Sequence, residues 1–193
     1  MRDRLDAALA DAERVLREFR TDAATLDAMA EMTRRIAEAF RGEGKLLTAG
    51  NGGSLADAMH VAEEFSGRFR RDRRPYPAIA LSDPTHMTCV ANDYGFEHVF
   101  SRQVEALARP GDLVLLLSTS GNSSNLVRAA EIARHKGVAV LGALGKGGGA
   151  LRPLCDVVLH APGETSDRIQ ELHMLAMHAI IEAVEVELGH EVT

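Results

Sequence analysis

Two parts of this chain combine histidine with carboxylate or amide side chains at helical spacing. His60 and Glu64 lie four residues apart, so they share one face of a predicted helix. Gln170, His173 and His178 lie on a second predicted helix, where Gln170 and His178 are about two turns apart. Such groups bind a metal ion or move protons as an acid–base pair. Spacing alone leaves both roles open, because a single histidine on an amphipathic helix is usually an ordinary surface or core residue.

A polar loop follows one predicted buried strand and leads directly into a helix. It carries four hydroxyl side chains, on Ser118, Thr119, Ser120 and Ser123. The N-terminus of a helix offers unpaired N–H groups and a partial positive charge, and hydroxyls add neutral hydrogen-bond donors. An ordinary capping turn needs only one hydroxyl. The loop therefore favours a phosphate site over a simple cap, although it lacks the Gly-Lys-Ser/Thr sequence of a P-loop.

A second loop, Asn51-Gly52-Gly53-Ser54, also joins a predicted strand to a predicted helix. Its glycines let the backbone approach a ligand closely. Taken alone this signal is weak, since strand-to-helix turns are often rich in glycine for steric reasons. In open parallel sheets, however, ligands bind at the carboxyl ends of the strands. Both polar loops occupy that predicted position.

The elements that carry these loops alternate between strand and helix. Strands rich in Val, Leu and Ala are predicted at 45–49, 78–81, 112–117, 138–144 and 157–160. Helices are predicted at 54–65, 84–91, 96–108, 124–135 and 166–188. Buried strands separated by helices indicate a parallel sheet covered on both faces. The predicted fold is therefore α/β, a three-layer αβα sandwich.

Two amphipathic helices precede the first strand. Apolar residues recur at helical spacing from Leu5 to Phe19, and Thr21 or Asp22 can cap a second helix that ends at Gly42. Residues 1–42 are therefore predicted to form a helical hairpin packed on the rest, a kind of surface that often serves in oligomers. No break in composition suggests a second domain, so residues 1–193 are treated as one domain.

Composition excludes several classes of protein. With 46% apolar and 26% charged residues the chain has the profile of a soluble globule, and its net charge of −6 argues against a general nucleic-acid binder. Its longest apolar stretches, such as Leu113 to Leu117, are too short to span a membrane. The charged first residues do not resemble a secretory signal. Cys89 and Cys155 lie far apart, which favours a reducing compartment and a cytoplasmic protein.

Five arginines crowd one short stretch, at positions 68, 70, 71, 73 and 74. The simple interpretation is a solvated loop. The alternative is a rim that attracts an anionic small molecule to a nearby site. The sequence leaves the two about equally favoured.

Five motifs occur in order over essentially the whole chain. They are Asn51-Gly-Gly-Ser54, Asp57-Ala-Met-His60-Val-Ala-Glu-Glu64, Asn92-Asp93-Tyr-Gly, Ser118-Thr-Ser-Gly-Asn-Ser123, and Arg168-Ile-Gln-Glu171 with His173 and His178. Together they resemble the phosphoheptose (sedoheptulose 7-phosphate) isomerases, a family of the sugar-isomerase (SIS) domain class. The serine/threonine loop is shared by all SIS domains, whereas the combination of Glu64, Gln170 and His178 is more specific.

The resemblance implies a flavodoxin-like SIS domain with a five-stranded parallel sheet. It also implies a homotetramer with active sites at subunit interfaces. The family's reaction converts sedoheptulose 7-phosphate to D-glycero-D-manno-heptose 7-phosphate through an enediol. That is the first step toward activated heptose for lipopolysaccharide or other surface glycans, so the expected partner is a small sugar phosphate.

The resemblance also implies roles for individual residues. It assigns the substrate phosphate to Ser118, Thr119, Ser120 and Ser123. It assigns the rest of the substrate to Asn51, Gly52, Gly53, Ser54, Glu64, Asn92, Asp93 and Gln170. It makes His60, Glu64, Gln170 and His178 the ligands of a zinc ion (Zn2+). Asp57 and Arg68 are further candidates of second rank. Relatives often have Asp-Thr where this chain has Thr165-Ser166, so a hydroxyl is kept there and a carboxylate is not.

Aldose–ketose interconversion needs a base at carbon, an acid at oxygen, and stabilisation of the enediolate charge. The hypothesis is that Glu64 moves the carbon-bound proton, that His178 moves the oxygen-bound proton, and that zinc polarises the carbonyl. Carboxylate and imidazole groups bound to zinc are weaker bases. Either these ligands leave the metal during turnover or one of the two roles differs. Glutamine is also an uncommon zinc ligand, which suggests a weak site.

Two other functions remain as alternatives. One is a non-catalytic SIS domain that binds a sugar phosphate as a regulator, of the type that binds the bacterial replication initiator. Loss of the catalytic glutamate and histidine would mark such a protein, and both Glu64 and His178 are present. The other alternative is an isomerase for an arabinose or hexose phosphate, against which only the resemblance argues.

Overall fold

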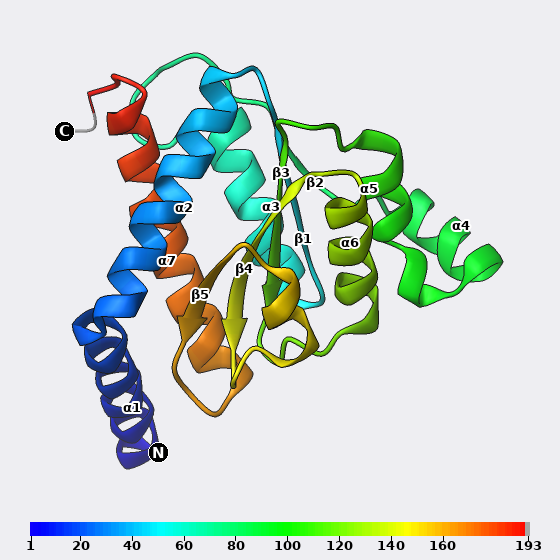
Figure 1. Cartoon of the computed structure of the whole chain (residues 1–193). Coiled ribbons are helices and arrows are strands. Elements are labelled where there is room, and N and C mark those ends of the chain that lie inside the picture. Colours follow the sequence, from blue (N-terminus) through cyan, green and yellow to red (C-terminus); the bar gives the residue numbers. More distant parts are fainter. Residues whose placement is uncertain (192–193) are drawn as a thin grey trace.

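A computed structural model describes residues 1–191 of the chain, and its centre is one parallel five-stranded sheet. The strand order is β2-β1-β3-β4-β5 (Figure 1). The strands are β1 (Leu46–Gly50), β2 (Ala78–Ala80), β3 (Leu113–Ser118), β4 (Ala139–Gly145) and β5 (Val157–Ala161). The predicted sandwich with a five-stranded parallel sheet is confirmed, with no strand end displaced by more than one residue.

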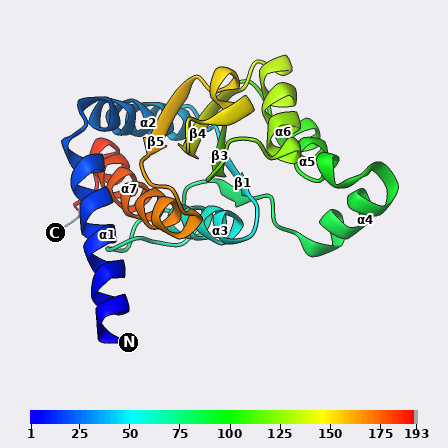
Figure 2. The ribbon, with the colours of Figure 1, turned by 90° about the horizontal axis from the view of Figure 1, so that it is seen from below.

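Helices cover both faces of the sheet, because alternate strand residues point to opposite sides. Leu115 packs into a core with α2, α3 and α7, whereas Leu116 packs into a second core with α4, α5 and α6 (Figure 2). The helices are α2 (Ala23–Arg41), α3 (Gly53–Ser66), α4 (Pro84–Tyr94), α5 (Ser101–Leu107), α6 (Ser124–His135) and α7 (Ser166–Glu187). Short 3-10 turns lie at Phe96–His98 and Gly149–Leu154. No helix within residues 1–191 has the length and apolar character needed to cross a membrane.

The strand order sets the position of the two polar loops. The chain leaves β1 toward β2 on one side and later returns to place β3 on the other side of β1. At the carboxyl end of this pair, Gly50 lies opposite Leu117. The loops that follow β1 and β3 therefore open side by side at the point where strand order reverses, which is where open α/β sheets bind ligands.

The first helix, α1 (Arg2–Thr21), projects away from the body in both views (Figures 1 and 2). Asp22 adopts an extended conformation between α1 and α2, and its side chain accepts a hydrogen bond from the Ala24 N–H. Both predicted helices form, but they are splayed and do not pack side by side as the predicted hairpin would. Because α1 has few neighbours, Leu5 and Leu9 of its apolar stripe remain 62% and 72% exposed.

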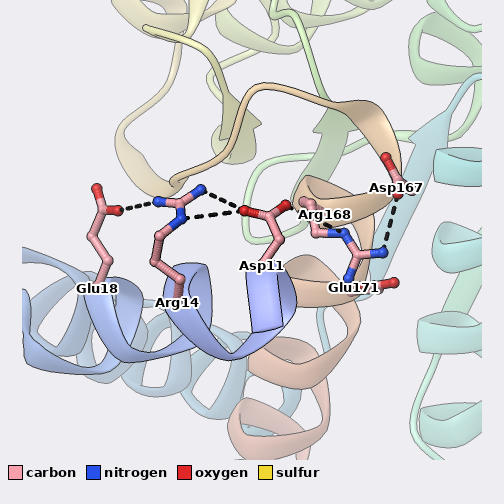
Figure 3. A network of polar contacts seen from close by, with 6 residues as sticks. All are labelled: Asp11, Arg14, Glu18, Asp167, Arg168 and Glu171. Carbon is pink, nitrogen blue, oxygen red and sulfur yellow. Dashed lines mark hydrogen bonds and ion pairs between the residues drawn. The ribbon is translucent and has the colours of Figure 1, made fainter. Parts of the chain in front are cut away.

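A chain of charged side chains connects α1 to the start of α7 (Figure 3). Asp11 accepts a 2.8 Å hydrogen bond from Arg14 and lies 3.9 Å from Arg168. Arg168 in turn donates to Glu171 at 2.7 Å. Most members of this network are well exposed, and exposed ion pairs contribute little to stability. The network therefore contributes little to holding α1 against α7.

Candidate active site

Three side chains come together from α3 and α7, two helices that pack on the same face of the sheet. His60 and Glu64 lie on α3, His178 lies on α7, and ligand atoms of all three are within 4.8 Å of one another. His60 Nε2 is 3.2 Å from Glu64 Oε1, and the His60 ring meets the His178 ring edge to face. The Glu64 side chain is only 14% exposed, while that of His60 is 44% exposed. The cluster is open enough for a ligand, and its carboxylate is partly desolvated.

Phe69 covers one face of the His178 imidazole. The two rings are stacked at 24° with centroids 5.8 Å apart. Phe69 belongs to the irregular segment between α3 and β2, where no periodic pattern marks a contact residue. Sequence reasoning missed it for this reason. Its apolar ring restricts how the imidazole can turn and keeps water from that side.

The hydroxyl loop after β3 lines a pocket of about 190 Å³. The lining residues are Asn51, Ser54, Leu117, Ser118, Thr119, Ser120, Ser123, Leu126, Ser166 and Gln170. Ser118 Oγ accepts a hydrogen bond from the Gly121 N–H at 3.0 Å, so this hydroxyl shapes the loop. Ser123 is the N-cap residue of α6, and its side chain makes no capping hydrogen bond within the described chain. Its hydroxyl is thus available to a ligand at the positive end of the helix.

Two contacts hold the hydroxyl loop in place. Gly121 has φ of +66°, and a Cβ there would lie 1.9 Å from the Gly148 carbonyl oxygen. Only glycine permits that close approach. On the other side, the Thr119 and Ser166 hydroxyls are 3.2 Å apart. Ser166 also lines the pocket.

The loop after β1 is fixed by an amide pair that sequence reasoning missed. Asn51 and Asn125 exchange two hydrogen bonds, of 3.0 and 2.9 Å. Asn125 is only 2% exposed and lies in the first turn of α6. Because a buried amide must be paired, this exchange sets the orientation of Asn51. An asparagine early in a helix gives no signal of a partner so far away in sequence.

Gln170 reaches the pocket from α7, the helix that also carries His178. Its Nε2 donates a 3.3 Å hydrogen bond to Ser54 Oγ, and it lies on the same helix as His178. A Cβ on Gly53 would come within 2.7 Å of the Gln170 amide. Glycine at that position therefore leaves room for Gln170. Gly52 beside it has φ of +56°, a conformation that favours glycine.

Asn92 and Asp93 lie apart from this pocket. They are exposed on α4, which projects from the side of the body (Figures 1 and 2). Asn92 donates a hydrogen bond to Asp93 at 2.7 Å. Neither residue is among those that line the pocket of its own chain. The structure thus separates these two predicted substrate contacts from those that line the pocket.

The second-rank candidates differ in their surroundings. Burial raises the pKa of Asp57 to about 6, although the nearby His60 acts in the opposite direction. The buried Asp57 Oδ2 has no hydrogen-bond partner among residues 1–191. A carboxyl group with such a pKa exchanges protons readily near neutral pH. Arg68 is exposed and is not a pocket residue.

Three of the five crowded arginines bind acidic residues near the C-terminus. Arg70 pairs with Glu182 at 2.8 Å, and Arg71 pairs with Glu191 at 2.8 Å. Arg73 pairs with Glu185 at 2.6 Å. Arg70 and Arg71 remain about half exposed, whereas the Arg73 side chain is only 2% exposed. The three ion pairs join the segment between α3 and β2 to α7 and to the residues after α7.

Comparisons with known proteins identify the family of this chain. Residues 9–145 match the model of the SIS domain family. The chain is 50% identical over 171 residues to the phosphoheptose isomerase of Fusobacterium nucleatum, covering 89% of this chain and 88% of that protein. It is 46% identical over 188 residues to that of Edwardsiella ictaluri, covering 97% of each. The solved phosphoheptose isomerase of Neisseria gonorrhoeae superimposes with a TM-score of 0.90 at 35% identity, covering 96% of this chain and 98% of that one. The chain belongs to the SIS domain family and, within it, to the phosphoheptose isomerases.

Proposed function

We propose that this chain catalyses the isomerisation of sedoheptulose 7-phosphate to D-glycero-D-manno-heptose 7-phosphate. The observation that carries the proposal is the meeting of His60, Glu64 and His178 on α3 and α7, the two helices that also supply Ser54 and Gln170 to the hydroxyl-lined pocket. The names of relatives that match it at 44–50% identity support the same substrate. Such a pocket suits the phosphate of a neutral sugar chain, and the cluster supplies groups that move protons.

The proposed substrate lies with its phosphate in the hydroxyl loop. Ser120 and Ser123 donate hydrogen bonds there, and the N-terminus of α6 favours the negative charge. Ser54 lines this pocket, and His60 lies six residues further along α3. Six helical residues rise about 9 Å, which matches an extended seven-carbon sugar phosphate better than a triose phosphate.

The reaction moves one hydrogen from C1 to C2 and another from the C1 oxygen to the C2 oxygen. In our proposal the Glu64 carboxylate takes the proton from C1, which leaves an enediol, and then returns a proton to C2. The His178 imidazole carries the proton between the two oxygens. The position of Glu64 favours this role, because its side chain is 14% exposed and its carboxylate lies within 4.8 Å of both imidazoles. No group is oxidised or reduced in the net reaction.

The same cluster fits a divalent metal ion, for which we propose zinc. Two imidazoles and one carboxylate match a catalytic zinc site with three protein ligands, and their ligand atoms already lie together. Gln170 is the proposed fourth ligand from the adjoining pocket. A bound metal would polarise the substrate carbonyl. Metal analysis of the purified protein and its His60→Ala variant tests this assignment, and equal zinc content in the two would contradict it.

We further propose that four copies assemble and share their sites. Leu5 and Leu9 on the projecting α1 offer apolar surface to a partner. Asn92 and Asp93 on α4 would then contact substrate in a neighbouring copy. Light scattering reports the oligomeric state. Mixing an Asp93→Ala variant with a Glu64→Gln variant should restore some activity if each site uses two copies, and none if Asp93 serves its own chain. Free Cys89 and Cys155 fit the cytoplasmic location proposed for the assembly.

The test of function is direct. Purified protein is mixed with sedoheptulose 7-phosphate, with and without zinc, and the aldoheptose phosphate is followed by NMR. Product is expected from the wild type. The His178→Ala variant should lose it, while the His135→Ala variant, altered at an exposed histidine ending α6, should retain it. A folded wild type that binds the substrate without converting it would favour the sugar-phosphate-binding regulator instead.

A further inference from the structure

A buried ion pair connects the two helices that carry the proposed reacting groups. Arg73 Nε lies 2.6 Å from Glu185 Oε1, and each side chain is only 2% exposed. Glu185 is on α7, about two turns beyond His178. Arg73 belongs to the segment between α3 and β2. Such a pair is unusual, because removing two charges from water is costly unless their remaining hydrogen bonds are satisfied.

The Arg73 guanidinium satisfies those bonds at the end of α3. Its Nη2 donates to the Glu64 carbonyl at 2.7 Å, and its Nη1 donates to the carbonyls of Phe65 and Gly67 at 2.9 and 3.1 Å. The last carbonyls of a helix have no partners within it and carry a partial negative charge. Arg73 therefore caps the C-terminus of α3 while it binds α7 through Glu185.

We propose that Arg73 and Glu185 are positioning residues that set Glu64 of α3 against His178 of α7. This inference rests on the proposed function. The Glu64 backbone carbonyl is itself a hydrogen-bond acceptor for Arg73, so the pair acts on the residue at the reacting centre and not only on the fold. Arg73 also lies over the Tyr76 ring, 5.1 Å from its centroid, which limits its own movement.

Stability alone does not account for this arrangement. Apolar residues of similar size often stabilise a fold as well as a buried ion pair does, or better. They cannot, however, donate directed hydrogen bonds to three carbonyl groups. A guanidinium reaches all of them at once because its donors are fixed in one plane. What the ion pair adds is therefore the relative placement of α3 and α7.

Four variants separate position from stability. Arg73→Met combined with Glu185→Leu removes both charges and leaves no unpaired charge in the core. Arg73→Lys keeps the positive charge but loses the planar set of guanidinium N–H donors. Arg71→Met is the matched control, because it removes a neighbouring arginine whose partner, Glu191, is exposed. Arg71→Lys controls for the lysine substitution.

Each purified variant is compared by thermal unfolding, by kcat and KM for sedoheptulose 7-phosphate, and by zinc affinity in competition with a coloured chelator. Residues that orient the groups around a metal typically contribute about 10- to 100-fold to affinity or activity. We expect that loss in kcat and in zinc affinity for the double variant and for Arg73→Lys. KM should stay within about threefold, because the phosphate loop is on a different element.

The outcomes are distinguishable. If the folded double variant and Arg73→Lys match the Arg71 controls in kcat and zinc affinity, the positioning role is wrong. The positioning role is also wrong if the double variant and Arg73→Lys both unfold while the Arg71 controls stay folded. The Arg73–Glu185 pair would then serve only to stabilise the fold. A wild type without isomerase activity would instead overturn the proposed function, and the zinc affinities would still report on the geometry.

Discussion

The imidazole rings of His60 and His178 meet edge to face with centroids 5.0 Å apart, although they belong to different helices. The contact exists because α3 and α7 lie together on one face of the sheet. The hydroxyl loop after β3 is a separate element that adjoins them through Gln170 and Ser54. Binding of phosphate and movement of protons are therefore assigned to different parts of the fold, and substitutions should affect them separately.

A substitution in the hydroxyl loop should weaken substrate binding and leave the rate of the chemical step nearly unchanged. Ser123→Ala removes a donor that caps no helix, so α6 should stay intact. A hydrogen bond to a charged group contributes about 1.5–3 kcal/mol, so KM should rise about 10- to 100-fold while kcat changes little. Steady-state kinetics measures both constants. The matched control is Ser124→Ala, at the exposed next residue, and equal KM values for the two variants would refute the phosphate assignment.

Substitution of Gly53 should displace Gln170, the pocket residue that is also the proposed fourth metal ligand. In Gly53→Ala the new Cβ would meet the Gln170 amide at 2.7 Å, and the flexible side chain must move away. We expect an intact fold and a kcat lower by about tenfold, as for other residues that orient a metal ligand. Gly42→Ala is the control, since a Cβ there has its nearest neighbour at 3.4 Å. Similar kcat values in both variants would show that Gln170 need not stay in place.

The fold was predictable because its signals are local. Buried parallel strands read as continuous Val, Leu and Ala runs, and each is followed by a turn and an amphipathic helix. The direction of α1 was not predictable, because the single extended residue Asp22 sets it and helical periodicity says nothing about such an angle. The predicted hairpin is wrong because Asp22 does not turn α2 back along α1.

The sequence indicated candidate site residues but not the residues that hold them in position. The spacing of His60 and Glu64 places them on one face of a helix from sequence alone. The covering by Phe69, the amide pair of Asn125 and the ion pair of Arg73 are contacts between segments distant in sequence. No periodicity encodes such contacts, so only the folded chain reveals them.

A buried histidine predicts how stability depends on pH. His173 is fully buried, and neither ring nitrogen has a hydrogen-bond partner among residues 1–191. Burial lowers its pKa from 6.5 to about 4; the backbone of Leu144 acts in the opposite direction, and the nearby His160 adds to the lowering. Between those pH values the unfolded chain binds more protons than the folded one. Stability is therefore full above pH 6.5 and is lost as the pH falls toward 4, by about 3 kcal/mol.

Urea unfolding at pH 7.5 and at pH 4 measures that loss. His173→Leu has similar volume and removes the titrating group, so it should lose about 3 kcal/mol less than the wild type over this range. His135→Leu, at an exposed position, should behave as the wild type. An identical pH dependence in His173→Leu and in the wild type would mean that this residue does not titrate in the way its burial implies.

The most direct test of the central claim compares Glu64→Gln with Glu63→Gln. The two glutamates are neighbours on α3, and Glu63 is exposed and outside the cluster. Each variant is incubated with sedoheptulose 7-phosphate in deuterated water, and the product is examined by NMR. General acid–base groups typically contribute about 10²- to 10⁴-fold, so Glu64→Gln should lose activity by that factor. Glu63→Gln and the wild type should form aldoheptose phosphate carrying deuterium at C2, as an enediol intermediate requires when the base exchanges with solvent. Product formation by Glu64→Gln at the rate of Glu63→Gln would contradict the account.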